Sequence, residues 1–273
     1  MPASELKARP FVETGVARHL LSRLRVIHED RGIAVISGPW GIGKTTAINE
    51  FTRERDGESV VVKIEPGTSK SGASPVAVMQ AVVKALAPWV RHSSHLPVIS
   101  TAYWKMKLLV GTYIEQMHGF DAGELIETPP LLTLIFDEAQ YLSPASIEML
   151  RYWNDDDRTV TPFPLGLAFV GNNEFSLEDS RSGQSVISGA VRSRALFIEA
   201  LDYLDITDAD ITLFLHSREV RDSAAVASVV AYYNGARVKR DLRNVERMIE
   251  TLKRRAGDHP VTGEIVRSFL NPV

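Results

Sequence analysis

Short apolar runs alternate with longer amphipathic stretches along the first 200 residues. The runs have the pattern of buried strands, being mostly apolar or β-branched and bounded by glycine or polar residues. They lie at 32–37, 60–64, 131–136, 165–170 and 196–198. The spacing of apolar residues between them predicts helices within the first 30 residues and over 44–53, 76–86, 101–118 and 143–154. Strands that alternate with helices predict a parallel sheet covered on both faces, and therefore an α/β fold.

From about residue 201 the pattern becomes entirely helical. The sequence therefore predicts an α/β domain over 1–200 and a small helical domain over 201–273. A helix is expected from about Arg237 to Arg255, with apolar side chains on one face and arginines on the opposite face. The apolar set is Val238, Leu242, Val245, Ile249 and Leu252, and the basic set is Arg240, Arg243, Arg247 and Arg254.

The amino-acid composition excludes several classes of protein. Apolar residues make up 44% of the chain and charged residues 24%, as in ordinary globular proteins. The absence of cysteine excludes disulfide scaffolds, thiolate metal sites and a cysteine nucleophile. The histidines are scattered and predict no metal site. No apolar run is long enough to cross a membrane, and the N-terminus lacks the apolar core of a secretory signal, so a cytoplasmic protein is expected.

The distribution of charge matters more than its sum. The whole chain carries a net charge of −3. Residues 131–200 hold five basic and ten acidic side chains, whereas residues 236–255 hold eight basic and three acidic ones. A mildly acidic protein can therefore still present a basic surface. The basic face of the last segment is either a solvated helix face or a surface for DNA phosphates or an acidic partner.

A phosphate-binding motif follows the first apolar run. Residues Gly38 to Thr45 fit G-x-x-x-x-G-K-[ST], between a strand and a helix as the motif requires. The glycines let successive backbone N–H groups point at one phosphate, and the helix N-terminus favours negative charge. Lys44 can reach the β- and γ-phosphates. The predicted nucleotide-binding residues are Gly38, Pro39, Trp40, Gly41, Ile42, Gly43, Lys44, Thr45 and Thr46.

Polar residues follow the third and fourth predicted strands. Asp137 and Glu138 end the third strand, at the edge where open parallel sheets bind their ligands. Asp137 and Thr45 are expected to hold Mg²⁺, and Glu138 to polarise the attacking water. Asn172, favoured over Asn173, follows the fourth strand and is expected near the γ-phosphate or the water. A turn built from glycine and asparagine is the alternative explanation for this segment.

Taken together, these residues resemble the AAA+ ATPases over nearly the whole chain. Asp137-Glu138-Ala139-Gln140-Tyr141-Leu142, with Glu148-Met149-Leu150-Arg151 and Phe169-Val170-Gly171-Asn172, is similar to the transposition regulators, namely the phage Mu B protein and the TnsC/TniB group. The Mu B protein has an N-terminal helix-turn-helix domain, which has no counterpart before the phosphate loop of this sequence. The resemblance implies a five-stranded parallel sheet flanked by helices and a helical C-terminal lid.

The resemblance to transposition regulators also implies a function. Proteins of this group bind ATP and Mg²⁺, assemble as rings or helical filaments on duplex DNA without sequence specificity, and recruit a transposase. Hydrolysis of ATP, stimulated by DNA, disassembles the filament and helps to select the target. The alternative is an ATPase switch of the signalling or secretion type, which gates a protein partner without DNA.

Three arginines are assigned from the same resemblance. AAA+ proteins place an arginine of the neighbouring subunit against the γ-phosphate, just before the fifth strand. Arg192 and Arg194 lie there, and Arg194 directly precedes the strand. A nucleotide-sensing arginine is expected near the start of the basic helix of the lid, where Arg243 fits better than Arg240.

Candidate DNA contacts lie in loops and insertions after the second strand, where DNA-binding AAA+ proteins line their central channel. The loop from Pro66 to Gly72 contains small polar residues and Lys70. The predicted helix that starts at Thr101 adds Lys105 and Lys107, which lie about 200° apart around the helix axis and so form no single patch.

Overall fold

The computed structural model describes residues 10–66, 72–90, 101–120, 127–155, 161–173, 187–235 and 238–270. Contacts divide the chain into two compact units. The sheet unit comprises Leu20–Gly38 and Ile48–Leu201, and the helical unit comprises Met1–His19, Pro39–Ala47 and Asp202–Val273. The contacts thus group the phosphate loop with the helical unit, whereas the domain boundary between residues 200 and 201 stays a prediction.

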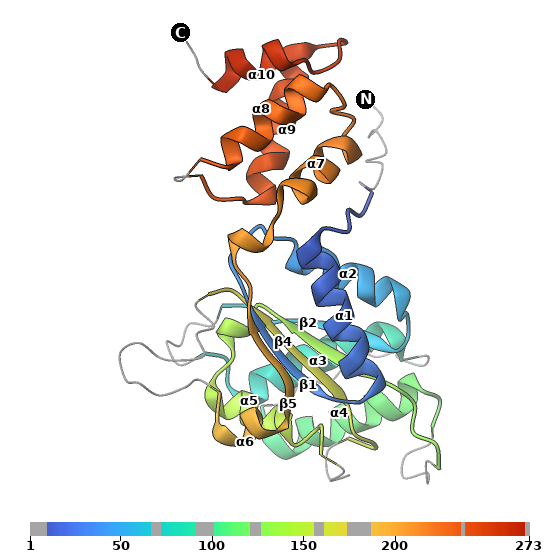
Figure 1. The fold of residues 1–273 in the computed structure, drawn as a ribbon. Coiled ribbons are helices and arrows are strands. Elements are labelled where there is room, and N and C mark those ends of the chain that lie inside the picture. Colours follow the sequence, from blue (N-terminus) through green and yellow to red (C-terminus); the bar gives the residue numbers. More distant parts are fainter. Residues whose placement is uncertain are drawn as a thin grey trace. The chain divides into compact units, whose positions relative to one another are not determined.

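The sheet unit contains five parallel strands in the order β2-β3-β4-β1-β5 (Figure 1). This arrangement confirms the predicted α/β fold with a five-stranded parallel sheet. Each of the five apolar runs forms one strand: β1 (Ile33–Ser37), β2 (Ser59–Lys63), β3 (Thr133–Asp137), β4 (Gly166–Gly171) and β5 (Ala195–Ala200). Ser37 pairs with Gly171, and Val170 pairs with Asp137, so β1, β4 and β3 end side by side.

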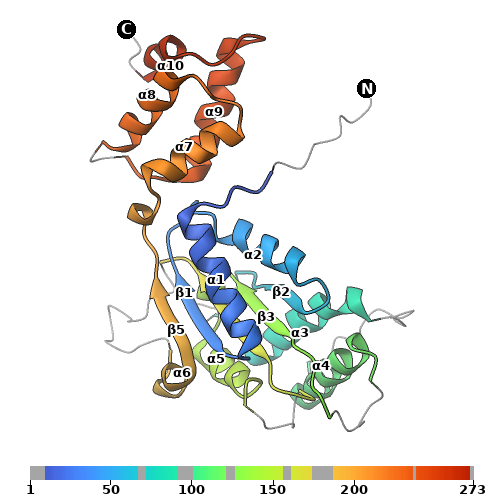
Figure 2. The ribbon, with the colours of Figure 1, turned by 45° about the vertical axis from the view of Figure 1, so that its right-hand side comes forward.

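Helices cover both faces of the sheet (Figure 2). Helices α1 (Gly15–Glu29) and α2 (Lys44–Glu54) lie on one face, and α3 (Pro75–Leu86), α4 (Tyr103–Met117) and α5 (Pro144–Arg151) lie on the other. Alternate strand residues, such as Val35 and Phe136, pack into one core cluster with the second group of helices. The residues between them, such as Ile36 and Ile135, are also fully buried. Both faces are therefore apolar, which explains the uninterrupted apolar runs.

Local capping signals set the starts of α3 and α5. Ser74 and Ser143 each accept a hydrogen bond from the backbone N–H three residues on, and a proline occupies the first helical position in both cases. The predicted start of α5 is thus confirmed, but the helix ends at Arg151 rather than near Asn154. Short 3₁₀ turns lie at Ala87–Trp89, Ala139–Tyr141 and Tyr203–Asp205, and α6 (Gly189–Arg194) precedes β5.

The helical unit contains α7 (Asp208–Ser217), α8 (Ser223–Tyr233), α9 (Leu242–Ala256) and α10 (Gly263–Leu270). The helix expected from about Arg237 begins only at Leu242, because the Asp241 carboxylate accepts the Arg243 N–H at 2.8 Å and caps it. Leu242, Val245, Ile249 and Leu252 are buried, as predicted for the apolar face. No helix in the described part of the chain is long and apolar enough to span a membrane.

Arg240 is a correction to the predicted basic stripe, since it precedes the helix. Its guanidinium donates to the Ile206 carbonyl at 2.5 Å, to the Asp208 carboxylate at 2.6 Å and to the Asn234 side chain. Arg240 therefore joins three segments of the helical unit. Arg243, Arg247 and Arg254 are exposed on α9.

Candidate nucleotide-binding site

The phosphate loop connects the end of β1 to the start of α2. Gly41 and Gly43 have φ angles of +80° and +98°, a backbone region that residues with a Cβ rarely adopt. A Cβ at Gly41 would also lie 1.8 Å from a carboxylate oxygen of Asp241. Glycine at position 41 is thus required both by its conformation and by the close approach of Asp241.

The start of α9 lies against this loop within the helical unit. The Leu242 N–H donates to the Gly41 carbonyl at 2.9 Å, and the next residue is Arg243. The Arg243 side chain is exposed at the N-terminal end of the helix. The sequence prediction placed a nucleotide-sensing arginine here, and of its two candidates Arg243 is the one in the helix, next to the loop contact.

Lys44 is the first residue of α2, as expected for the lysine of a phosphate loop. Its ammonium donates to the Pro39 carbonyl at 2.8 Å, so the side chain folds back across its own loop. Thr45 and Thr46 follow in the first turn of the helix, where N–H groups have no partners further back in the helix. This segment combines a cation, hydroxyls and helix-terminal N–H groups, which suits it to phosphate.

Asp137 and Glu138 lie at the carboxyl end of β3. Asp137 is the last residue of the strand and is 5% exposed. One of its carboxylate oxygens accepts the Glu138 N–H at 3.0 Å. Glu138 has φ 61° and ψ 41°, a left-handed conformation that costs a non-glycine residue about 1–2 kcal/mol. The chain reverses sharply at Glu138, and the 3₁₀ turn Ala139–Tyr141 begins immediately afterwards.

Gln140 links the ends of β3 and β4. Its side-chain N–H donates to the Glu138 carboxylate at 2.6 Å, and its side-chain oxygen accepts the Asn172 N–H at 3.1 Å. The Gln140 side-chain amide thus donates one hydrogen bond and accepts another. Together these two bonds link the Glu138 carboxylate to the backbone that follows β4. In the sequence Gln140 stands out only as part of a motif and has no predicted role, because no local pattern reveals a partner 32 residues away.

Asn172 directly follows β4, the strand that lies between β3 and β1 in the sheet. It is 2% exposed, whereas Asn173 is exposed. The predicted position of Asn172, between the strand with the two acids and the strand before the phosphate loop, is therefore confirmed by the strand order. Its contact with nucleotide or water stays a prediction.

Comparison with known proteins identifies the family. Residues 27–177, more than half of the chain, match the model of the AAA domain family. The chain belongs to this family. It is thus a P-loop ATPase of the AAA+ class, as the resemblance implied. The match does not extend to the transposition regulators, so that assignment stays a prediction.

Solved structures show the same fold at low sequence identity. RuvB of Thermotoga maritima, a Holliday junction branch migration motor, has a TM-score of 0.51 and 16% identity over 96% of this chain and 72% of its own. Cdc6p of Pyrobaculum aerophilum has a TM-score of 0.60 and 15% identity over 95% of this chain and 66% of its own. No curated protein matches the sequence. At these identities the likeness concerns the fold alone.

The two predicted arginines of this AAA+ protein lie in the last turn of α6, directly before β5. Both side chains are exposed. The Arg194 guanidinium lies 2.9 Å from the Asp155 carboxylate, which also accepts a hydrogen bond from Arg151 at 2.9 Å. Within one subunit Arg194 is therefore held by Asp155, and its action on a neighbouring subunit stays a prediction.

Arg151 is buried and, through Glu148, also supports the start of α6. It donates to Glu148 at 2.7 Å, and Glu148 accepts a second hydrogen bond from the Ser188 hydroxyl at 2.7 Å. Burial raises the pKa of Glu148, but the hydrogen bonds from Ser188 and Arg151 outweigh it and hold that pKa below its ordinary value. Glu148 and Arg151 belong to the segment that resembles transposition regulators, and here they fix the helix cap at Ser188.

The predicted DNA-binding lysines are only partly described. Lys70 lies outside the described residues. Lys105 is exposed on α4, with its ammonium 5.4 Å from the centre of the Trp104 ring, and Lys107 is half-buried on the far side of buried Met106. As predicted, Lys105 and Lys107 do not share one face of the helix, and their contact with DNA stays a prediction.

Proposed function

We propose that this AAA+ ATPase assembles on duplex DNA in its ATP-bound form and regulates transposition, by selecting target DNA and recruiting a transposase. One observation carries the ATPase part. A glycine-rich loop follows β1, while Asp137, Glu138 and Asn172 follow the neighbouring strands β3 and β4. The DNA and transposition parts are supported by the resemblance of residues 137–151 and 169–172 to transposition regulators.

Each group has a proposed role that its chemistry fits. The loop N–H groups and Lys44 bind the phosphates of ATP. The Thr45 hydroxyl and the Asp137 carboxylate are hard oxygen donors of the kind that Mg²⁺ prefers, and bound Mg²⁺ neutralises charge on the phosphates. Glu138 accepts a proton from the attacking water, and the Gln140 amide holds its carboxylate in place.

Gln140→Ala is expected to lower kcat roughly ten- to a hundredfold, because loss of a positioning contact misaligns the base. The KM for ATP should change little, since Gln140 touches no loop residue in the described contacts. Gln140→Glu should be more damaging than Gln140→Ala, because it places a second carboxylate beside Glu138. Steady-state phosphate release measures these effects, with Gln116→Ala, an exposed change on α4, as the control. Unchanged turnover in both Gln140 variants would contradict the assigned role.

Arg192 and Arg194 are proposed to act on the ATP of a neighbouring subunit. Arg194→Ala or Arg192→Ala should leave the monomer folded, because both side chains are exposed, but weaken ATP-dependent assembly and turnover. Mixing an arginine variant with Glu138→Gln should restore part of the activity, since some interfaces then regain both groups. Turnover is measured across mixing ratios, with the exposed Arg53→Ala as the control. A complete lack of recovery at every ratio argues against a shared site.

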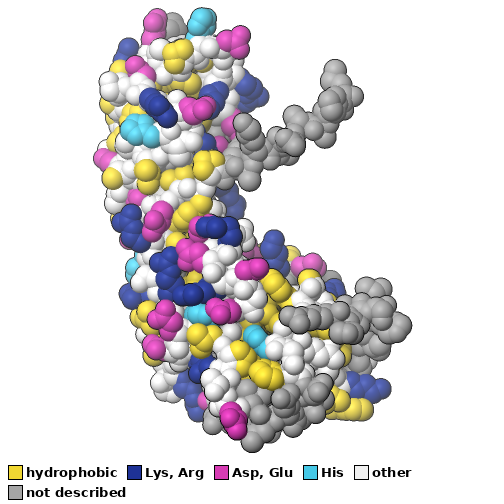
Figure 3. Space-filling model, turned by 90° about the vertical axis from the view of Figure 1, so that its right-hand side faces the viewer, with side chains coloured by type: hydrophobic (Ala, Val, Ile, Leu, Met, Phe, Trp, Pro, Cys, Tyr) yellow, Lys and Arg dark blue, Asp and Glu magenta, His cyan; other side chains and the backbone are white. Residues whose placement is uncertain are grey.

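DNA binding is proposed to depend on assembly, because one subunit offers few well-placed cations. Basic and acidic side chains lie intermixed on the face shown in Figure 3. The whole chain is net acidic, at −3. An ATP-bound oligomer would repeat one small basic patch along the duplex and so gain many phosphate contacts. A similar fold, RuvB, is a Holliday junction branch migration motor, which supports DNA as the polymer on which the oligomer forms.

Duplex DNA is therefore expected to bind only when a slowly hydrolysed ATP analogue is present, and with little dependence on sequence. A complex with about six to ten phosphate contacts loses roughly a thousandfold or more in affinity between about 50 and 200 mM salt. Lys70→Ala, Lys105→Ala and Lys107→Ala should weaken binding on all sequences alike, and Arg18→Ala should not. Fluorescence anisotropy on labelled duplexes of unrelated sequence measures both effects.

The same measurement tests the alternative function. Tight binding by the nucleotide-free monomer, or no binding in any nucleotide state, would refute assembly on DNA. The protein would then be better explained as an ATPase switch that gates a protein partner. ATP turnover with and without duplex DNA separates the two functions a second time, because only the first requires stimulation by DNA.

A further inference from the structure

The sheet is open along the outer edge of β2, where it has no further strand among the described residues. Glu58 accepts the Thr133 N–H at 3.0 Å, and the Ile64 N–H donates to Asp137 at 3.2 Å. Alternate residues of a parallel strand bond to the same neighbour. Val61 and Lys63 alternate with the residues whose backbone groups face β3. Their own backbone N–H and C=O groups therefore point toward the open edge.

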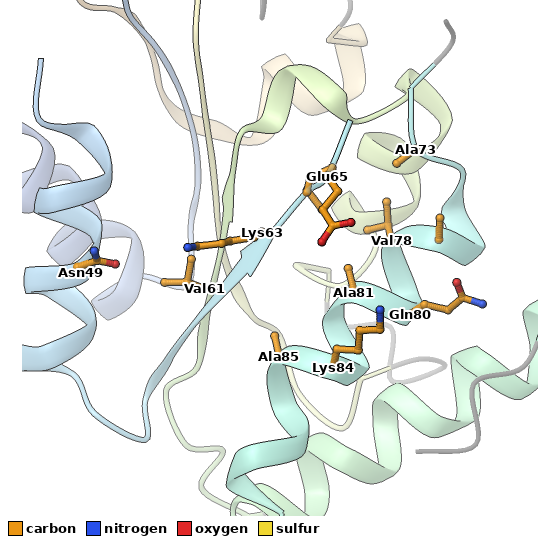
Figure 4. A pocket seen from close by; sticks show the side chains of 12 residues that line it. Asn49, Val61, Lys63, Glu65, Ala73, Val78, Gln80, Ala81, Lys84 and Ala85 are labelled. Atoms are coloured by element: carbon orange, nitrogen blue, oxygen red, sulfur yellow. The ribbon is translucent and has the colours of Figure 1, made fainter. Parts of the chain in front are cut away.

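A groove of about 450 Å³ runs along this edge (Figure 4). Val61, Lys63 and Glu65 form one wall, α3 forms the opposite wall, and Asn49 of α2 lies at one end. All of the residues that line it belong to the sheet unit. The groove therefore presents the unpaired backbone of an edge strand beside a helix.

The wall formed by α3 leaves room for a main chain. Ala77, Ala81 and Ala85 are spaced four apart and lie on one face of α3, and all three line the groove. Each projects only a methyl group. An added strand would lie about 4.8 Å from β2, and side chains larger than alanine would fill that space.

The charged side chains of the groove select the chemistry of its occupant. Lys63 extends toward α2, whereas Glu65 and Lys84 lie nearer the α3 side (Figure 4). Among the described residues no ion pair joins any of these three side chains to another group. Two ammonium groups and one carboxylate give the groove a net positive charge, so it favours a strand with an acidic side chain.

We propose that this groove, lined by β2 and α3, binds an extended acidic segment of a partner protein, which adds to the sheet as a strand beside β2. Main-chain hydrogen bonds to Val61 and Lys63 supply affinity, and alternate side chains of the segment supply specificity. Apolar side chains of the segment face the alanines of α3, and acidic ones, on the opposite face of the added strand, reach Lys63. Lys84 adds positive charge on the α3 wall of the groove. This inference does not depend on ATP hydrolysis or on DNA.

The test uses the full chain and three labelled peptides. The first alternates valine with glutamate, the second replaces the glutamates with lysines, and the third is the acidic peptide with prolines in place of alternate residues. The chain should bind the first peptide and not the others, because lysines meet like charges and proline cannot donate to the edge. Hydrogen exchange at the Val61 and Lys63 amides should slow when the first peptide binds.

Variants separate the groove from nonspecific charge. Lys63→Glu combined with Lys84→Glu should weaken binding of the acidic peptide about tenfold or more and favour the lysine peptide. Ala77→Glu fills the groove at an exposed position in the first turn of α3, where glutamate suits the helix, and should abolish binding with no loss of fold. Arg221→Glu reverses one positive charge at an exposed residue outside the groove and should have no effect.

Three other outcomes would overturn the proposal. Equal binding of all three peptides would show that neither charge nor main-chain pairing selects the occupant. Binding of the acidic peptide without protection of the Val61 and Lys63 amides would show that charge alone attracts it. Protection of these amides that rises with protein concentration in the absence of peptide, and is lost in Ala77→Glu, would identify a second copy of this chain as the occupant.

Discussion

Lys44→Ala is expected to abolish ATP binding, with a loss of at least roughly a hundredfold in affinity, because a charge-assisted contact to phosphate is worth several kcal/mol in a partly buried site. No other group in the loop Gly38–Thr45 carries a positive charge. Gly41 and Gly43 shape the backbone but cannot replace the ammonium. Titration calorimetry with ATP and Mg²⁺ measures the loss directly.

The fold should survive this change. The lysine donates to the Pro39 carbonyl at 2.8 Å, and neither residue belongs to the apolar core cluster of the sheet unit. Thermal unfolding of the variant should therefore match that of the natural chain. Lys253→Ala, an exposed change on α9 whose partner is Glu219, is the control and should bind ATP normally. Normal ATP affinity in Lys44→Ala would contradict the assignment of the phosphate loop.

Glu138→Gln is expected to separate binding from turnover. ATP affinity should stay within a few-fold of the natural chain, because the phosphates are held by the loop. Turnover should fall by roughly 10²–10⁴-fold, the usual contribution of a general base. Glutamine has the size of glutamate and its side-chain oxygen can still accept the N–H of Gln140, so the turn after β3 should persist. Single-turnover phosphate release with calorimetric ATP binding measures both quantities.

The left-handed backbone at Glu138 supplies a second comparison. Glu138→Gly should relieve the backbone strain but remove the carboxylate, so it should be as inactive as Glu138→Gln without loss of stability. ATP hydrolysis at the natural rate in either variant would show that Glu138 is not the base. The Gln140 variants retain the Glu138 carboxylate. Their rate of ATP hydrolysis should therefore lie between the rates of the natural chain and of Glu138→Gln.

Local sequence was sufficient to predict the five strands, helices α1 to α5 and the phosphate loop. The apolar runs predicted β1, β3 and β4 because both faces of the sheet are buried at these strands, so no alternation interrupts the run. Serine followed by proline predicted the start of α5 because both residues act through the backbone of the first helical turn. The phosphate loop was predictable for the same reason, since its chemistry lies within eight consecutive residues, Gly38 to Thr45.

Contacts between distant segments were decided only by the tertiary structure. The order β3-β4-β1 places Asn172 between two motifs, and the Gln140 amide reaches both Glu138 and the Asn172 backbone. Asp241 approaches Gly41 closely and also caps α9, so it fixes both the phosphate loop and the start of this helix. Helical periodicity had placed the start of α9 four or five residues too early. Periodicity reports which face of a segment is buried, but it does not report which remote polar group caps or joins that segment. The groove beside β2 depends likewise on the strand order, because only that order leaves Val61 and Lys63 at an edge facing the alanines of α3.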